Sequence, residues 1–218
     1  MDTSVSGVGV LDKAVRLLAV LGDGPLALAP LTEATGLSRP TAHRLAVALE
    51  AHGLVRRDEA GRFTLGLRLV DLGRVAAASV PVAEAARPAL EALRDETGES
   101  AQLYVRDGDR RVCLASLESP HGLRTIVPVG ASLPLDVGSA GRVLAAPDDV
   151  GSRGWVESVA EREAGVASVS APVLGTGGTV VAAVSVSGPI ERTTRAPGRR
   201  YGTAVVRAAR AVEAVVGR

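Results

Sequence analysis

Apolar residues recur every three or four positions in the first part of the chain. From Val10 to Leu21 the apolar positions are 10, 14, 17, 18 and 21, which share one face of an amphipathic helix. A second, shorter helix is predicted from Leu28 or Pro30 to Thr35, and Gly36 is typical of the residue that caps a helix at its C-terminal end. The pattern therefore predicts a small helical module at the start of the chain.

A third helix and a short hairpin follow. Ser38 is a favourable N-cap, Pro40 is tolerated in a first helical turn, and the helical pattern continues to His52. Residues 54–57 and 62–65 then form two extended pieces around a turn that ends in glycine. Two helices, a tight turn, a third helix and a two-stranded wing are the order of a helix-turn-helix with a wing.

The periodicity changes in the second part of the chain. A helix at 67–79 leads to Val80-Pro81, an expected hinge, because the residue before a proline avoids the helical conformation. Helices are then predicted at 82–97 and from about 197 to 216. Short apolar runs between them predict strands, two of them around the turn at 106–109 and others at 123–129, 167–174 and 179–187.

Mixed helices and mostly antiparallel strands predict an α+β fold for this part. The expected organisation is an N-terminal domain at 1–66, a linker helix at 67–81 and a second domain at 82–218.

Composition and charge narrow the classes of function. The formal net charge is only +1, but residues 39–68 hold six arginines against three acidic residues, a positive stripe on the third helix and the hairpin. The single cysteine, Cys113, excludes an intramolecular disulfide and is expected to be a small buried side chain in a strand. Because the chain shows no signal peptide and no apolar run of membrane-spanning length, we expect a cytoplasmic protein with no membrane partner.

The third helix has the two faces that a DNA-reading helix needs. At 100° per residue, Ala42, Leu45 and Leu49 cluster on a core-facing side, which leaves the basic side chains on the other. Arginine bonds guanine at two atoms or grips phosphate, and a wing arginine would lie near the flanking DNA backbone. The candidate DNA contacts are Ser38, Arg39, Pro40, Thr41, His43 and Arg44 on the helix and Arg62 on the wing. The same face also fits a solvated basic surface for protein contacts, but turn, cap, wing and local charge together favour DNA.

Several segments resemble the IclR family of bacterial transcription regulators. In the first half these are LDKAVRLLAVL, LTEATGLSRPTAHRLAVALEAHGLVRRD and GRFTLGLRLVDLG, and in the second half ESAQLYVRDGDRRVCLAS and PVGASLPLDVGSAGRVLAA. The resemblance implies a winged helix-turn-helix, a linker helix that dimerises, and a GAF-like domain that binds a small-molecule effector. It also implies homodimers or tetramers on double-stranded operator DNA, and it supports Thr41, which helical geometry places nearer the core.

Shorter phrases point within the family. GESAQLY, EREAGVASVSAPV and SVSGPIERTTR resemble most closely the actinobacterial NdgR/AreB branch. That resemblance implies control of genes for leucine and wider amino-acid metabolism.

An enzyme is not expected, and neither is a cofactor. The three histidines, His43, His52 and His121, are scattered, so neither a metal site nor a serine triad has the required spacing. No glycine-rich phosphate loop with its lysine precedes a helix. A hydrolase or isomerase fused to a DNA-binding module is a third hypothesis, which ranks behind a ligand-responsive regulator and a ligand-insensitive one.

A small-molecule pocket is better supported. Residues 136–144 predict the start of a helix, whose free amides attract a carboxylate, and the matching turn in the family lies beside the effector site. Ser185 and Ser187 share one face of a strand by alternation, although serines also fill tight spots in a sheet. The resemblance adds Ser168, where a Cys is often found, and an acidic residue near Glu161 or Glu163. The candidate effector residues are Gly138, Ser139, Ala140, Glu161, Ser168, Ser185 and Ser187, and the expected ligand is a small organic or amino-acid-like molecule.

One departure from the family pattern bears on that pocket. Between Ala146 and Trp155 the chain lacks a helix-length segment that helps to wall the pocket in family members. The sequence therefore leaves open a ligand-responsive regulator and a regulator whose degenerate effector domain no longer responds to ligand.

Overall fold

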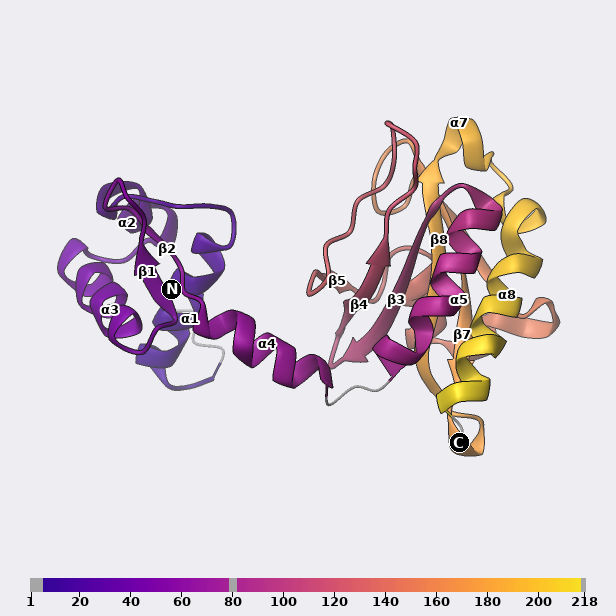
Figure 1. The fold of residues 1–218 in the computed structure, drawn as a ribbon, viewed down its shortest axis with the longest axis horizontal. Helices are drawn as coiled ribbons and strands as arrows, with labels where there is room; N and C mark the ends of the chain where they lie inside the picture. The colour runs from indigo at the N-terminus through magenta and orange to yellow at the C-terminus, as the bar shows by residue number, and fades with distance from the viewer. Residues whose placement is uncertain (1–5, 79–81, 217–218) are drawn as a thin grey trace. The chain divides into compact units, whose positions relative to one another are not determined.

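The computed structural model describes residues 6–78 and 82–216 and divides the chain into two units, Met1–Ser79 and Val80–Arg218 (Figure 1). Each unit is described by itself. The hinge expected at Val80-Pro81 lies outside the described residues.

The first unit has the predicted order of helices and hairpin. Its elements are α1 (Gly9–Leu21), α2 (Leu28–Thr35), α3 (Arg39–Ala51), β1 (Val55–Arg57), β2 (Phe63–Leu65) and α4 (Arg68–Ala78). Gly36 caps α2 with φ of +66°, a left-handed conformation that glycine adopts without a steric penalty, so the predicted cap is confirmed. The core joins all three helices to the wing through Leu17, Leu21, Leu31, Ala46, Leu49, Val55 and Phe63.

The second unit is a six-stranded antiparallel sheet with helices on both faces, which confirms the α+β prediction. Its strands lie in the order β5-β4-β3-β8-β7-β6. They are β3 (Ser100–Asp107), β4 (Arg110–Leu117), β5 (Ser132–Pro134), β6 (Val156–Val159), β7 (Val166–Leu174) and β8 (Val180–Pro189). The helices are α5 (Val82–Thr97), α6 (Ser139–Ala145), η1 (Pro147–Arg153), η2 (Thr176–Gly178), α7 (Ile190–Thr193) and α8 (Pro197–Val216).

The two faces of this sheet differ in chemistry. Helices α5 and α8 cover one face of the sheet (Figure 1). This face is apolar, and Leu90 and Val205 pack in one cluster with Leu103 and Val184. The other face lies under α6, where Cys113 is fully buried as the sequence predicts. It is this second face that carries the polar side chains of the candidate effector site.

The strand predicted for 123–129 is wrong. This segment is irregular, and the edge of the sheet is β5, which pairs with β4 through Arg110↔Pro134. Leu123, Ile126 and Val129 are exposed, so their apolar character reflects no packing within the unit. The segment is held by a hydrogen bond of 2.7 Å from the Ser100 hydroxyl to the Thr125 carbonyl rather than by a strand ladder.

Candidate functional site

The outward side of α3 presents the basic groups expected to contact DNA. Ala42, Ala46 and Leu49 are buried and anchor the helix, while Thr41 is half-buried. The predicted contacts on or directly before this helix that are exposed are Ser38, Arg39, Pro40, His43 and Arg44. The side chains of Arg39, His43 and Arg44 make no hydrogen bond or ion pair with any residue that the structure describes. The helix thus holds out two unpaired guanidinium groups.

Ser38 lies at the N-cap position of α3 but does not cap it through its side chain. Its hydroxyl donates to the Thr41 hydroxyl at 2.9 Å instead of accepting from a backbone amide of the first turn. The free amides of that turn are therefore left for another acceptor or for water.

The arginines of the wing are mostly engaged with the protein itself. Arg62 donates from Nε to the Asp58 carboxylate at 2.7 Å, and its hydrogen bond holds the pKa of Asp58 below the usual value. Arg57 stacks over the Phe63 ring at 4.3 Å and contacts Glu50. By contrast Arg56 is exposed, and its side chain has no partner among the described residues. Within the described part of the wing, Arg56 is thus an unpaired cation; it belongs to the positive stripe but is not one of the predicted DNA contacts.

In the second unit, strand register gathers polar residues into two rows on the α6 face of the sheet. One row runs Ser158↔Ser168↔Ser187↔Ser100 across four strands. The next runs Ser170↔Ser185↔Gln102. Residues paired in this way project from the same side of a sheet, so the rows make one polar floor.

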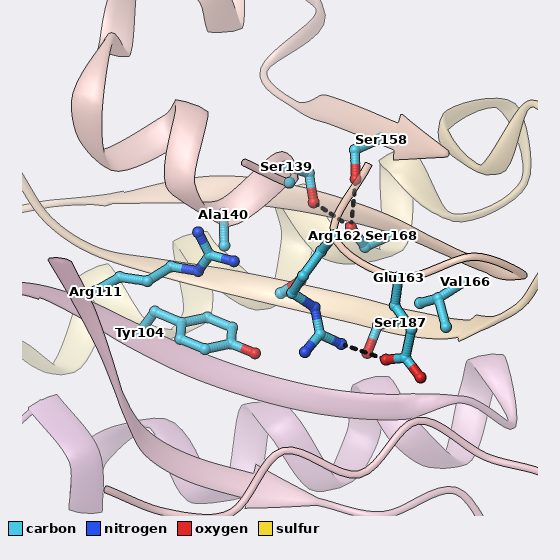
Figure 2. A pocket seen from close by; sticks show the side chains of 12 residues that line it. Tyr104, Arg111, Ser139, Ala140, Ser158, Arg162, Glu163, Val166, Ser168 and Ser187 are labelled. Atoms are coloured by element: carbon cyan, nitrogen blue, oxygen red, sulfur yellow. Dashed lines mark hydrogen bonds and ion pairs between the residues drawn. The ribbon is translucent and has the colours of Figure 1, made fainter. Parts of the chain in front are cut away.

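The serines of this floor hydrogen-bond to one another and to α6. The Ser139 hydroxyl lies 2.7 Å from that of Ser168 and 2.8 Å from that of Ser170. Ser158 lies 3.0 Å from Ser168, and Ser170 donates to Ser185 at 2.9 Å. Ser187 donates separately to the Gln102 side-chain carbonyl at 3.1 Å. Figure 2 shows the two hydrogen bonds of the Ser168 hydroxyl, to Ser139 and to Ser158.

A cavity lies above the serine floor, and it brings together six of the seven predicted effector residues. These are Gly138, Ser139, Ala140, Ser168, Ser185 and Ser187. Tyr104, Arg111, Ser158, Arg162, Glu163 and Val166 complete the lining (Figure 2). Most of these groups are polar or charged, so the cavity suits a small polar ligand.

Glu161, the seventh predicted residue, is not part of the lining. Its carboxylate accepts the backbone N–H of Gly138 at 3.1 Å and lies 3.0 Å from Nη2 of Arg142. The amide at the start of α6 that was expected to be free for a ligand is thus occupied by the protein's own carboxylate. Glu163, two residues on, is the acidic side chain that lines the cavity.

Arg111 is built into one wall of the cavity. The side chain is 3% exposed, and Nη1 donates to the carbonyls of Pro134 and Val137. Its guanidinium lies 5.5 Å from the centre of the Tyr104 ring. Burial lowers the pKa of Arg111 and raises that of the Tyr104 hydroxyl, and the nearby charge of Arg162 further lowers the pKa of Arg111. The wall therefore carries a fixed positive charge in a poorly solvated place.

Arg162 reaches into the cavity from the loop between β6 and β7. In Figure 2 its guanidinium extends toward Tyr104 and Ser187, and its Nη2 lies 3.5 Å from the Glu163 carboxylate. The free space that remains is about 30 Å³, enough for roughly two water molecules. The Arg162 side chain thus extends into a cavity that has little free space.

Two of the lining residues that are not among the predicted effector contacts, Arg111 and Tyr104, could have been predicted from strand alternation. Arg111 is two positions before the buried Cys113, so alternation puts it on the same inward face of β4. Tyr104 is likewise in phase with Ser100 and Gln102 on β3. Arg162 and Glu163 belong to a loop, where no periodicity shows which way a side chain points.

Among the residues that the structure describes, no group of three or more His, Cys, Asp or Glu side chains is placed to hold a metal ion. None of the helices in the described ranges is both long and apolar enough to cross a membrane.

Comparison with known proteins assigns both units. The IclR helix-turn-helix domain matches residues 10–59, and the bacterial transcriptional regulator IclR C-terminal domain matches residues 75–153 and 148–214. The chain is 30% identical over 245 residues to the glycerol operon regulatory protein of Streptomyces griseus, covering 95% of this chain and 94% of that protein. It is also 30% identical over 131 residues to the HTH-type transcriptional regulator KipR of Bacillus subtilis (strain 168). That match covers 60% of this chain and spans about half, 52%, of KipR.

The fold agrees with these matches. An IclR homolog from Microbacterium hydrocarbonoxydans, solved in complex with 4-hydroxybenzoate, superposes with a TM-score of 0.80 at 20% identity, over 95% of this chain and 98% of that one. With both of its units matched in order, the chain belongs to the IclR family of DNA-binding transcription regulators, which is not a family of enzymes.

Proposed function

We propose that this regulator binds its operator through the exposed face of α3 and the wing, and that a small organic or amino-acid-like acid bound in the cavity of the second unit changes its affinity for DNA. A ligand shifts such an equilibrium only by its differential affinity for the DNA-competent and DNA-incompetent arrangements. The proposed DNA contacts are Ser38, Arg39, Pro40, Thr41, His43, Arg44 and Arg62. The proposed effector contacts are the six predicted residues that line the cavity.

The observation that carries this proposal is the pair of unpaired arginines on α3. Arg39 and Arg44 are exposed, and their side chains have no partner among the described residues, although nearby Arg57 and Arg62 are both paired. Their charges are therefore available for base edges or phosphates in a major groove, which is wide enough to admit a helix.

The test is a titration of the protein against its own upstream DNA at several salt concentrations. Binding should weaken steeply with salt because neutralised phosphates release counterions. Arg44→Ala should weaken operator binding by roughly 1–3 kcal/mol if Arg44 reads a base. Arg210→Ala removes an exposed arginine of α8 and should leave binding unchanged. Parent-like operator binding by Arg44→Ala would refute the proposed role of α3.

The effector class follows from the charges of the cavity. Arg111 and Arg162 both line it, and Glu163 is the only carboxylate among its lining residues in the described structure, so an anion is favoured over a cation. The homolog from Microbacterium hydrocarbonoxydans is complexed with a carboxylate, 4-hydroxybenzoate. The resemblance of EREAGVASVSAPV and SVSGPIERTTR to the NdgR/AreB branch supports leucine-type amino-acid metabolism as the regulon.

A second candidate function is a regulator that has lost its response to ligand. It is favoured by the short connection at 147–153, which forms only the 3₁₀ helix η1, and by the small free space in the cavity. Calorimetry with leucine, 2-ketoisocaproate, pyruvate and 4-hydroxybenzoate separates the two functions. Binding of none of them, together with unchanged DNA affinity in their presence, would favour the ligand-insensitive regulator.

A homodimer or tetramer is also proposed, on the basis of exposed apolar side chains. In the first unit these are Val8, Val10, Leu11 and Val15 in or beside α1, and Leu67, Val70, Leu72 and Val75 in or beside α4. Apolar groups gathered on helices in this way are typical of protein interfaces. As a DNA-binding transcription regulator, the oligomer is proposed to act in the cytoplasm.

A further inference from the structure

The loop at 160–165, between β6 and β7, is closed at its base and strained there. The backbone N–H of Ala160 donates to the carbonyl of Val166 at 2.8 Å. Ala160 has φ of +57°, a left-handed conformation that alanine adopts only at a steric cost. Such conformations persist where the surrounding structure imposes them, and they concentrate at ligand clamps and switches.

The three charged side chains of this loop have different surroundings. Glu161 does not line the cavity, and its carboxylate accepts hydrogen bonds from the Gly138 N–H and from Arg142. Arg162 points into the cavity (Figure 2). Glu163 lines both this cavity and a second hollow of about 440 Å³, whose wall also includes Leu123 and Ile126. Glu163 therefore stands where the inner cavity meets open space.

Arg162 and Arg111 differ in how firmly they are held. Arg111 is 3% exposed and bonded to two backbone carbonyls. The Arg162 side chain is 26% exposed, and the ion pair at 3.5 Å with the exposed Glu163 is its one ionic contact among the described residues. An exposed pair at that distance is weak. Arg162 is thus the cation that can turn and exchange its partner, while Arg111 cannot.

The small free volume of the cavity also points to Arg162. With Arg162 inside, about 30 Å³ is free, which is too little for an organic acid. A ligand of several carbon atoms needs more room than this, and Arg162, which is held among the described residues only by its ion pair with Glu163, is the lining cation that can move to provide it.

We propose that Arg162 is the residue that selects for a carboxylate effector, and that Glu163 is the internal anion which the effector's carboxylate replaces. This inference rests on the proposed function of the cavity. The incoming carboxylate takes two charge-assisted hydrogen bonds from the guanidinium fork of Arg162, close to the fixed charge of Arg111. A neutral ligand offers no such exchange, so it leaves Arg162 paired with Glu163 and the loop in place.

The test compares acids with their neutral amides on the full-length protein by calorimetry. The probes are 2-ketoisocaproate, pyruvate and 4-hydroxybenzoate, each with its amide. Arg162→Ala should weaken binding of the acid that binds the parent by roughly ten- to a hundredfold and should abolish the preference for acid over amide. Glu163→Gln removes the competing anion and should tighten acid binding by about two- to fivefold.

Matched controls separate these effects from bulk charge and from loss of folding. Arg210→Ala and Asp109→Asn change the same charges at exposed positions outside the cavity and should bind as the parent does. A variant that is merely destabilised would lose acid and amide alike, whereas the inference requires loss of the preference between them.

The outcomes are distinguishable from failure of the proposed function. If an acid binds the parent and Arg162→Ala with equal affinity and equal preference, the role of Arg162 is overturned and the effector site stands. If no probe binds the parent at all, the effector function fails, and the inference fails with it.

Discussion

At the scale of single residues, the second unit buries hydroxyl groups where most sheets bury hydrocarbon. Ser170 is fully buried, and Ser139 and Ser185 are nearly so. Each buried hydroxyl must find a partner because an unsatisfied one costs more free energy than the bond itself contributes. The serine chain meets that requirement, and it also keeps hydroxyl groups facing the cavity in fixed positions.

Ser170 is the central link of this chain, so its loss should be felt in stability. Ser170→Ala removes a hydroxyl bonded to both Ser139 and Ser185 and leaves two partners short of a bond. We expect the free energy of unfolding in urea to fall by roughly 1–2 kcal/mol. Ser152→Ala, at an exposed position in η1, is the matched control and should change it by less than about 0.5 kcal/mol. Equal values for the two variants would show that the serine chain contributes nothing to folding.

The residues of the cavity were predictable where they belong to regular elements. Ser185 and Ser187 follow from alternation on β8, and the same rule extends to Arg111 on β4. Arg162 lies in a loop whose path depends on contacts with α6, some twenty residues earlier in the chain, through Glu161 and Arg142. No local pattern encodes such a contact, so the side chain that fills the cavity could not be found from the sequence.

At the scale of elements, the wing is a basic hairpin whose charge is partly neutralised from within. Asp58 accepts the backbone N–H groups of Ala60 and Arg62 and also pairs with the Arg62 side chain. The Arg62 hydrogen bond lowers the pKa of Asp58, so the ionised carboxylate stabilises the folded wing. This stabilisation is fully present above the unfolded-state pKa of about 3.9, and it is lost as the pH falls through the lower pKa of the folded state. At neutral pH the pair is intact, and Arg62 must leave Asp58 before it can contact phosphate.

Releasing Arg62 should therefore strengthen DNA binding. Asp58→Asn keeps the oxygen that the turn amides need but loses the ion pair. We expect operator affinity to rise severalfold and the slope of log affinity against log salt to steepen by about one unit, as for one additional phosphate contact.

Glu59→Gln is the matched control, since it removes the same charge from the same turn at an exposed side chain with no partner among the described residues. Fluorescence anisotropy with labelled operator measures both variants. If Glu59→Gln strengthens binding as much as Asp58→Asn does, the effect is one of net charge, and Arg62 is not the group released.

Helices with several turns of amphipathic pattern were predicted well. Some short strands, which depend on pairing with a neighbouring strand, were predicted poorly. The helices at Arg39–Ala51 and Pro197–Val216 show several turns of apolar residues on one face, so packing and pattern agree. The segment 123–129 has β-forming residues but is paired with no strand among the described residues, whereas the three residues of β5 are paired with β4. Whether a segment forms a strand depends on the neighbouring strand with which it pairs, and the local sequence does not show that neighbour.

At the scale of the whole molecule, the exposed apolar side chains fall into separate groups on the two units. In the first unit they include Leu72 and Val75 of α4, three residues apart on one side of the helix. In the second unit Leu123, Ile126 and Val129 are exposed along the irregular segment. Either group offers a surface that a second copy of the chain can bury. A dimer that places two recognition helices on two half-sites of an operator needs only one of these groups.

We predict that the α4 group holds the dimer. Leu72→Glu places a charge in that interface and should weaken self-association at least tenfold, as measured by sedimentation velocity over a range of protein concentrations, because an unpaired charge is costly to bury. Operator binding should weaken as well, because each DNA-binding domain then binds its half-site as a monomer and loses the avidity of the dimer. Val129→Glu makes the matching change in the second unit and should leave the dimer intact, although it would dissociate a tetramer built on that group. If Val129→Glu yields monomers and Leu72→Glu does not, the dimer is held through the effector domain instead, and α4 serves only to join the two units.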